Sequence, residues 1–302
     1  MTCWKLGLLG LDTPHVVHMA RLLGSGEVTG GRIVAAYPGG SDDFELSRSR
    51  VKGYTATLKN EFGVAILDDP EAVAEQADIV LITAVDGRCH RALLEATIGL
   101  GKPTFIDKPF ATSLADAQAM VDLAEARGVP LMSCSSWRYH EPFQAAIRSH
   151  SSVLGCDVFG WLEFEATQPG LFWYGIHCVE MVIAAMDVGC VRVSVMASHD
   201  VDLISAEWAD GRVATIRGMR CGAYTFGGVL HTENGPVRFD DDGNTSRTRH
   251  ARLLEAILAN LPHGRSAVPT GQMLEVMRLI EAANESRALG RLVETAPLSG
   301  VT

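Results

Sequence analysis

The sequence predicts two domains: an α/β domain with a doubly wound parallel sheet, and an α+β domain with a largely antiparallel open sheet. Three observations carry this prediction. The chain has 302 residues, which is long for one compact core and suits two domains. Short apolar runs alternate with helix-like stretches over residues 5–133, and longer alternating runs follow. We place the domains at 1–135 and 136–302, and the alternative that the last helices pack back on the first domain stays open.

The first domain begins with a strand, a turn and a helix. KLGLLG (5–10) is apolar, and PHVVHMARLL (14–23) has helical spacing. Helices are also expected over 89–100 and 114–126, the latter with Ser113 as its N-cap. Apolar runs bounded by Gly, Pro or Asp predict buried strands over 32–37, 64–67, 78–84, 103–106 and 130–133. Such strands, alternating with helices, are typical of a parallel sheet that is covered on both faces.

The second domain has longer strands with alternating residues, which suit an antiparallel sheet. Two amphipathic helices, over 250–261 and 271–290, close the chain. The strands are expected over 157–167, 191–198, 212–219 and 223–232.

Composition and charge exclude several kinds of partner. The formal net charge of -10, without a cluster of Lys and Arg, opposes nucleic acid. No stretch approaches the roughly 20 apolar residues of a membrane span, and no signal-like run begins the chain. Seven cysteines without a C-x-x-C pair suit a reducing compartment. We therefore expect a cytoplasmic protein that binds neither nucleic acid nor membranes, and we expect no metal, because pairs such as His15 and His18 arise often by chance.

The turn after the first strand is that of a dinucleotide-binding fold in which residues have been replaced. In the pattern G-x-G-x-x-G the glycines allow a tight turn, close approach of the pyrophosphate and close helix packing. Here Gly10 keeps the first position, whereas Asp12 and His15 occupy the other two. Thr13 as N-cap and Pro14 in the first turn still predict a helix N-terminus with unpaired N–H groups.

Asp12 leaves two interpretations open. In the first, Asp12 caps the helix, occupies the anion site and prevents a dinucleotide from binding. In the second, Asp12 turns away and the cofactor binds mainly through its ribose and nicotinamide. A carboxylate about 5 Å from a diphosphate costs on the order of 3 kcal/mol per charge pair. The turn alone therefore favours the first interpretation.

The second strand lacks the acidic residue that usually grips the adenosine ribose. Tyr37 stands at its end, and Asp42 and Asp43 follow several residues later. Ser41 and Arg48 are candidates for binding a 2'-phosphate, although a solvated loop also accounts for both. The choice between NAD and NADP therefore stays open.

Five stretches, taken together, resemble the glucose-fructose oxidoreductase, inositol dehydrogenase and MocA (Gfo/Idh/MocA) family. Asp107-Lys108-Pro109 resembles its Glu-Lys-Pro motif, with Asp for Glu. DIVLITAVDGRCHRALLEA (78–96) resembles the strand and His-bearing turn before that motif, with His90 at the matching position. WRYHEPF (137–143), GIHCVEMV (175–182) and EVMRLIEAANESRALGRLV (275–293) resemble the entry into the second domain, its substrate helix and the C-terminal helix. The resemblance covers essentially the whole chain.

The resemblance implies a Rossmann domain that binds NAD or NADP, and hydride transfer to or from a sugar, polyol or related cyclic hydroxy or keto compound. It also implies that Lys108 polarises the reacting oxygen, that His177 is the acid/base, and that the C-terminal sheet builds a homo-oligomer, a dimer or tetramer. Histidine titrates near neutral pH and an ammonium stabilises a developing negative charge, so the residue types suit these roles. With the turn, the expected cofactor contacts are Gly7, Gly10, Asp12, Thr13, Pro14, His15, Tyr37, Asp86, His90, Asp107 and Lys108.

One departure concerns the acid/base. Trp173 stands where the family has an Asp four residues before its catalytic histidine. Glu180, three residues after His177 on the same helical face, can orient the imidazole instead, and a solvated carboxylate is the equal alternative. The expected lining of the substrate cleft is Trp137, Arg138, Trp173 and Tyr174.

Two functions remain open on the sequence. The first is an NAD(P)-dependent oxidoreductase, which we favour because Lys108 and His177 occur together. The alternative is a non-redox protein on the same fold, a ligand sensor or a lyase or isomerase, in which Asp12 blocks the pyrophosphate site.

Overall fold

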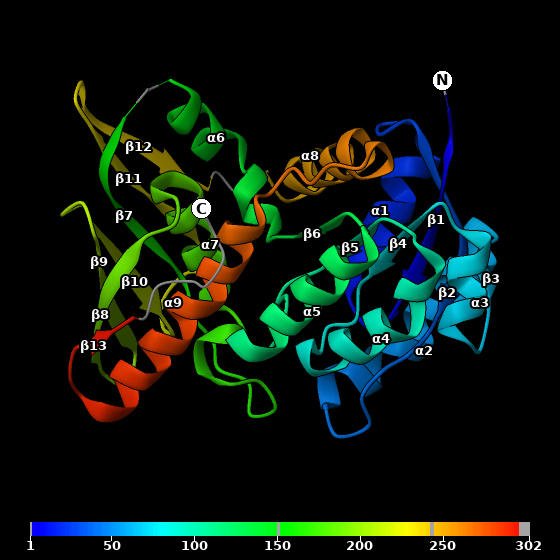
Figure 1. The fold of residues 1–302 in the computed structure, drawn as a ribbon, viewed down its shortest axis with the longest axis horizontal. Coiled ribbons are helices and arrows are strands. Elements are labelled where there is room, and N and C mark those ends of the chain that lie inside the picture. Colours follow the sequence, from blue (N-terminus) through cyan, green and yellow to red (C-terminus); the bar gives the residue numbers. More distant parts are fainter. Residues whose placement is uncertain (1, 150–151, 242–244, 296–302) are drawn as a thin grey trace. The chain divides into compact units, whose positions relative to one another are not determined.

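The computed structural model describes residues 2–149, 152–241 and 245–295 (Figure 1). They form two compact units, one within Met1–Cys134 and His250–Thr270 and the other within Ser135–Arg249 and Gly271–Thr302. Helix α8 (Thr245–Asn260) therefore begins in one unit and ends in the other.

The first unit contains a six-stranded parallel sheet with the order β3-β2-β1-β4-β5-β6. The order reverses between β1 and β4, and open α/β sheets bind their ligands at such a switch point. The strands are β1 (Trp4–Leu9), β2 (Gly31–Tyr37), β3 (Ala65–Ile66), β4 (Ile79–Ile82), β5 (Thr104–Ile106) and β6 (Leu131–Ser133).

Helices connect these strands in two groups. Helix α1 packs on α2, whereas α3, α4 and α5 pack in a row. Because crossovers between parallel strands are right-handed, and because the strand order reverses after β3, the two groups cover opposite faces of the sheet. The helices are α1 (Pro14–Gly24), α2 (Glu45–Phe62), α3 (Pro70–Gln76), α4 (His90–Thr97) and α5 (Leu114–Arg127).

The turn between β1 and α1 has the predicted helix start. Thr13 is the N-cap, and its side chain accepts a hydrogen bond from the backbone N–H of His15 at 3.4 Å. Pro14 opens the helix. Gly10 has φ of +96°, and a Cβ at this position would lie 2.4 Å from backbone atoms of Ala84. The turn therefore requires glycine at this one surviving position of the pattern.

The second unit contains a seven-stranded sheet with the order β12-β11-β7-β10-β9-β8-β13. Neighbouring strands within this sheet are antiparallel, except for β7 and β10, which are parallel. The predicted fold class, a parallel Rossmann-like sheet followed by a largely antiparallel one, is therefore confirmed. The strands are β7 (Val153–Trp161), β8 (Cys190–Ala197), β9 (Val201–Trp208), β10 (Val213–Met219), β11 (Phe226–Thr232), β12 (Gly235–Asp240) and β13 (Val293–Glu294).

Two long helices pack on this sheet or its ends. Helix α7 (Gly175–Met186) covers β7 and β10. Helix α9 (Thr270–Leu289) is tied to β8, because the carboxylate of Glu275 accepts a hydrogen bond from the N–H of Cys190 at 2.8 Å. Before the sheet, the 3-10 turn η3 (Ser136–Tyr139) leads into α6 (Glu141–Arg148).

Several elements differ from the expectation. Strand β7 ends at Trp161, so the expected strand over 157–167 is too long at its C-terminal end. Helices α2, α3 and α6 and strands β9, β12 and β13 were not predicted. Within the described ranges, no helix has both the length and the apolar character that crossing a membrane requires.

We predict that Gly10→Ala lowers the free energy of unfolding by about 3 kcal/mol, because the new methyl group meets the Ala84 backbone and the residue keeps a positive φ. Chemical denaturation measures the change. Gly26→Ala is the matched control, since Gly26 also has a positive φ (+73°) but open space around it; about 1 kcal/mol is expected there. Equal losses in the two variants would contradict the packing argument.

Candidate active site

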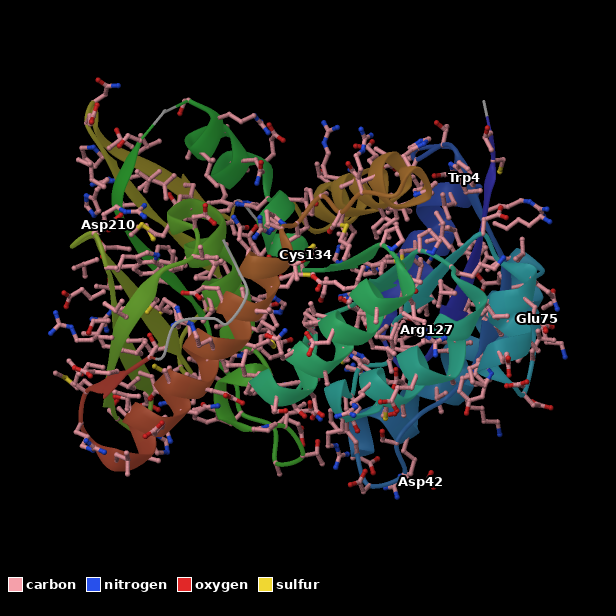
Figure 2. The ribbon with its side chains drawn as sticks, in the orientation of Figure 1. Trp4, Asp42, Glu75, Arg127, Cys134 and Asp210 are labelled. Carbon is pink, nitrogen blue, oxygen red and sulfur yellow. The ribbon has the colours of Figure 1, made fainter. Side chains whose placement is uncertain are left out.

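The predicted cofactor residues of the first unit lie where its strands end. The turn of residues 10–15 follows β1, Tyr37 closes β2, Asp86 follows β4, and Asp107-Lys108 follows β5. Because parallel strands present their carboxyl ends at one edge, these residues share that edge of the sheet. Figure 2 shows Asp42 in the loop that leaves β2.

Asp12 is fully buried and engaged by two other segments. Its Oδ2 accepts a hydrogen bond from the Ser47 hydroxyl at 2.6 Å, and its Oδ1 accepts one from the Val85 N–H at 2.8 Å. Burial raises the pKa of Asp12, and the hydrogen bonds from Ser47 and Val85 offset this only in part. Thr13 is the N-cap of α1, so the expected capping of this helix by Asp12 is wrong.

His15 occupies the third position of the glycine pattern and joins α1 to the strand motif. Its Nδ1 pairs with the carboxylate of Asp107, which also accepts a hydrogen bond from the N–H of Lys108 at 2.8 Å. Burial raises the pKa of Asp107, but His15 and Lys108 outweigh burial and hold the pKa well below its usual value. Asp107 is therefore an anion that anchors the motif.

Lys108 is the second residue after β5 and is half-buried, and its peptide bond to Pro109 is cis. Burial lowers the pKa of Lys108, Asp107 acts in the opposite direction, and Arg50 adds to the lowering. A lysine whose pKa is lowered in this way both stabilises negative charge and gives up a proton readily.

His90 forms a link between two loops. Its Nε2 lies 2.7 Å from the carbonyl oxygen of Ala84, and its Nδ1 lies 3.3 Å from that of Phe110. The side chain is fully buried. These contacts are those of a structural histidine that holds the loop after β4 against the Lys108 motif, and they do not support the expected contact with a cofactor.

A cluster that the sequence did not reveal joins the loops after β2 and β4. Arg88 donates to Asp43 at 2.8 and 2.9 Å and to Asp86 at 2.7 Å. The Ser41 hydroxyl donates to Asp86 at 2.6 Å. The Arg88 guanidinium lowers the pKa of Asp43, and the two carboxylates raise the pKa of Arg88. Asp86, one of the predicted residues, is thus part of a charged network.

In the second unit, His177 projects from α7 and is held by a serine. The Ser135 hydroxyl lies 2.7 Å from Nδ1 of His177, and it also accepts a hydrogen bond from the N–H of Trp137 at 3.2 Å. The rings of Tyr174 and Phe226 meet the imidazole edge-on, at centroid distances of 5.5 and 5.8 Å. Ser135 was missed because nothing in the local sequence marks it.

Glu180 and Arg138 form a buried ion pair. Arg138 Nε donates to Glu180 Oε1 at 2.6 Å, and Arg138 Nη2 donates to the side-chain oxygen of Gln272 at 2.6 Å. Burial raises the pKa of Glu180, and Arg138 offsets it in part. We expected Glu180 to orient His177, but its carboxylate pairs with Arg138 instead. The side chain that contacts the imidazole is that of Ser135.

The aromatic residues expected in the substrate cleft are more buried than that role requires. Trp137 is 1% exposed and packs between the Phe226 ring, 4.2 Å away, and the guanidinium of Arg249, 4.0 Å away. Trp173 is also buried and meets Tyr174 at 5.8 Å. Tyr174 in turn meets the exposed Tyr224 at 6.1 Å.

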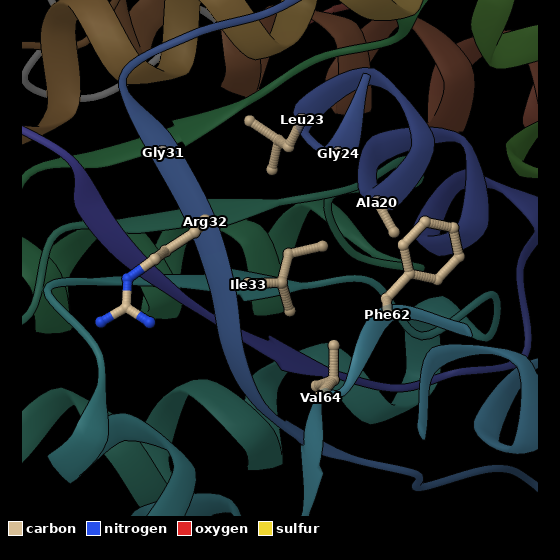
Figure 3. Close-up of a pocket in the computed structure, with 8 residues that line it drawn as sticks. All are labelled: Ala20, Leu23, Gly24, Gly31, Arg32, Ile33, Phe62 and Val64. Carbon is tan, nitrogen blue, oxygen red and sulfur yellow. The ribbon is translucent and has the colours of Figure 1, made fainter. Parts of the chain in front are cut away.

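A pocket in the first unit lies apart from all of these residues. The pocket opens between α1, the start of β2 and the end of α2. Figure 3 shows that the Arg32 guanidinium points away from the apolar side chains that line the pocket. It is at the amino end of β2, opposite the edge that carries Lys108. The lining residues are Ala20, Leu23, Gly24, Gly31, Arg32, Ile33, Phe62 and Val64. Among the described residues, no three His, Cys, Asp or Glu side chains group as metal ligands would.

The carboxyl edge of the first sheet fits a dinucleotide. Gly10 keeps the tight turn, and no acidic residue lies in the first turn of α1, so the helix N-terminus retains its affinity for an anion. Both carboxyl oxygens of Asp12 are engaged, one by the Ser47 hydroxyl and the other by the Val85 N–H. The repulsion between Asp12 and a diphosphate, which the altered turn led us to expect, is thereby reduced.

Comparison with known proteins agrees with this fit. Residues 46–134 match the model of an oxidoreductase family with an NAD-binding Rossmann fold, the Gfo/Idh/MocA family. A D-apiose dehydrogenase of Paraburkholderia graminis is 38% identical over 94 residues, which are 31% of this chain and 25% of the relative. An inositol 2-dehydrogenase of Paracoccus denitrificans is 33% identical over 145 residues, which are 48% of this chain and 40% of the relative. The matches thus span less than half of each relative.

Solved structures share the fold of the whole chain. A myo-inositol dehydrogenase of Lactobacillus casei, in complex with NAD(H) and myo-inositol, superposes with a TM-score of 0.77 at 15% identity over 100% of this chain and 99% of its own. An oxidoreductase of Agrobacterium radiobacter, in complex with NAD+, L-tartaric acid and magnesium, has a TM-score of 0.76 at 20% identity over 96% and 98%. The predicted resemblance is confirmed: residues 46–134 match the model of this family, and the chain shares the fold of these solved structures.

Proposed function

We propose that this chain is an NAD(H)-dependent dehydrogenase that acts on a sugar, polyol or related cyclic hydroxy or keto compound. The observation that carries the proposal is the position of Lys108, two residues after β5 at the carboxyl edge of the first sheet, within residues 46–134 that match an NAD-binding oxidoreductase family. The names of the relatives, an apiose and an inositol dehydrogenase, support the substrate class.

The first unit would hold the dinucleotide. Gly10 and the N–H groups at the start of α1 would face its diphosphate. The bound nicotinamide would supply the hydride acceptor or donor. Lys108 would hydrogen-bond the reacting oxygen of the substrate, and its ammonium would stabilise the negative charge that develops there.

His177 would take the proton from the substrate hydroxyl, and return it in the reverse direction. When the Ser135 hydroxyl accepts a hydrogen bond from Nδ1–H, the imidazole carries its lone pair on Nε2, which is the form that a general base requires. Ser135 is thus a positioning residue, in the place that we expected Glu180 to take. The contacts of Asp12 with Ser47 and Val85 count against the non-redox alternative, which needs this carboxylate in the pyrophosphate site.

The charged cluster after β2 favours NAD over NADP. Asp43 and Asp86 bring two negative charges and Arg88 brings one positive charge, so the cluster has a net charge of −1. A 2'-phosphate would add about two negative charges beside it, and no free cation of this cluster would receive them. The hydroxyls of an unmodified ribose can instead donate to the carboxylates.

We further propose that the open sheet of the second unit makes contacts between copies of the chain. Large apolar side chains are exposed on three of its strands, namely Leu154 on β7, Met196 on β8 and Val213 on β10. Exposed apolar groups on a sheet are typical of such interfaces.

We expect Lys108→Met and His177→Asn to lower kcat/KM by at least about a hundredfold, while NADH binding changes little. Lys108→Met removes charge stabilisation, and His177→Asn removes proton transfer. The assay follows NAD+ reduction with a panel of sugars and polyols that includes inositol and apiose.

Two variants control for mutation of a surface lysine or histidine. Lys59→Met and His231→Asn change exposed side chains of the same types and should retain wild-type activity. Wild-type turnover in Lys108→Met or His177→Asn would overturn the assigned role, and a wild type that reduces NAD+ with no member of the panel would overturn the substrate class.

We predict that the wild type binds NADH at least about tenfold more tightly than NADPH, and that Asp43→Asn narrows this ratio by strengthening NADPH binding about tenfold. The substitution removes one of the two carboxylates that neutralise Arg88. Fluorescence titration measures both affinities. Asp42→Asn, a change at the adjacent exposed aspartate, should leave the ratio unchanged; equal binding of NADH and NADPH by the wild type would refute the argument.

A further inference from the structure

Among the residues that the structure describes, Arg249 is a buried cation that forms no ion pair, although the charge of Asp241 acts on it. It lies in α8 and is 9% exposed. Of the ion pairs formed by the described side chains, none includes Arg249. Its polar contact is from Nε to the Ser136 hydroxyl, at a long 3.3 Å, and its guanidinium stacks on Trp137 at 4.0 Å. A buried charge of this kind is costly unless an anion compensates it.

The other deeply buried arginines of the second unit do have carboxylates. Arg138, also 9% exposed, pairs with Glu180 at 2.6 Å. Arg278, 7% exposed, pairs with Glu275 at 2.5 Å. In this unit, carboxylates therefore neutralise the buried guanidinium groups of Arg138 and Arg278. Arg249 differs because no described carboxylate forms an ion pair with it.

Arg249 and His177 are held by the same short segment. Ser135 contacts the imidazole, Ser136 contacts the guanidinium, and Trp137 stacks beneath the guanidinium. The three residues are consecutive, so the Cα atoms of the first and third are at most about 7.6 Å apart. One segment thus positions the acid/base and the unpaired cation together.

Aromatic rings connect His177 to Arg249: the Phe226 ring meets the imidazole at 5.8 Å and the Trp137 ring at 4.2 Å, and Trp137 lies beneath the guanidinium. Tyr174 meets both His177, at 5.5 Å, and Tyr224, at 6.1 Å. Burial lowers the pKa of Arg249, and Tyr224, Asp241 and Tyr174 offset this in part. The guanidinium nevertheless remains charged at neutral pH, because its ordinary pKa is above 12.

We propose that Arg249 binds an anionic group of the substrate, so that the enzyme acts on a sugar or polyol that carries a carboxylate or a phosphate. A guanidinium matches either group with paired N–H donors, whereas a neutral polyol offers no counter-charge. The inference rests on the proposed function for its chemistry, but the binding of the anion does not depend on turnover.

The test compares three aldoses (glucose, galactose and mannose) with their uronic acids and their 6-phosphates. Binding is followed by tryptophan fluorescence, to which Trp137 beneath Arg249 contributes, and turnover is followed with NAD+. We expect at least one charged compound to bind about tenfold or more tightly than its neutral parent. Preference for the uronic acids or for the 6-phosphates identifies which anion the site takes.

The variants are Arg249→Gln and Arg249→Lys, with Arg238→Gln at an exposed arginine of β12 as the control. Arg249→Gln should abolish the preference for the charged compound while neutral sugars bind as before. Arg249→Lys should retain part of the preference, and Arg238→Gln all of it. Melting temperatures check that each variant is folded.

The outcomes separate this inference from the proposed function. If anions bind through Arg249 but no compound is oxidised, the dehydrogenase proposal fails and the anion site stands. If neutral sugars are oxidised, and neither charged series binds more tightly than the neutral one, the anion site fails and the dehydrogenase proposal stands. A variant Arg249→Gln that loses stability and loses all ligands equally would show a structural role and would also overturn the anion site.

Discussion

The carboxyl group of Asp12, held between the Ser47 hydroxyl and the Val85 N–H, is the interaction on which the proposed function depends. It connects the turn before α1 to the start of α2 and to the loop after β4, at the edge where the sheet reverses its strand order. An aspartate at this position of a glycine pattern would repel a diphosphate if it faced the ligand. Because both of its oxygens are engaged by Ser47 and Val85, the helix start keeps its character as an anion site.

His15, which replaces the third glycine of the pattern, has a different partner from Asp12. His15 pairs with Asp107, so helix α1 is fastened to the segment that carries Lys108. His90 fastens the loop after β4 to the residues that follow the same lysine. The segment that carries the motif lysine is therefore positioned by charge pairing and hydrogen bonds from the first turns of α1 and α4. In the second unit, the segment Ser135–Trp137 has the corresponding role for His177 and Arg249.

Much of the fold could be predicted from the sequence, because buried strands and helix starts leave local signals. Thr13 and Pro14 marked the start of α1 correctly, and the change of pattern after residue 135 separated the two kinds of sheet. Helix α2 was missed because few of its residues are buried. The site was harder, since its partners are distant in sequence. Glu180 lies near His177 in the helix, but it pairs with Arg138, which is 42 residues away. Neither Ser135 nor Arg249 has a local pattern that identifies it.

The most direct test is a titration of the wild type and of Asp12→Asn with NADH, followed by energy transfer from tryptophan. The substitution removes the charge and keeps the shape. If Asp12 is turned away from the diphosphate, the wild type binds NADH with a micromolar dissociation constant, and Asp12→Asn binds within about threefold of it. If instead the wild type does not bind, and Asp12→Asn gains about a hundredfold in affinity, the carboxylate faces the diphosphate. That result would contradict an NAD(H)-dependent function for the native chain.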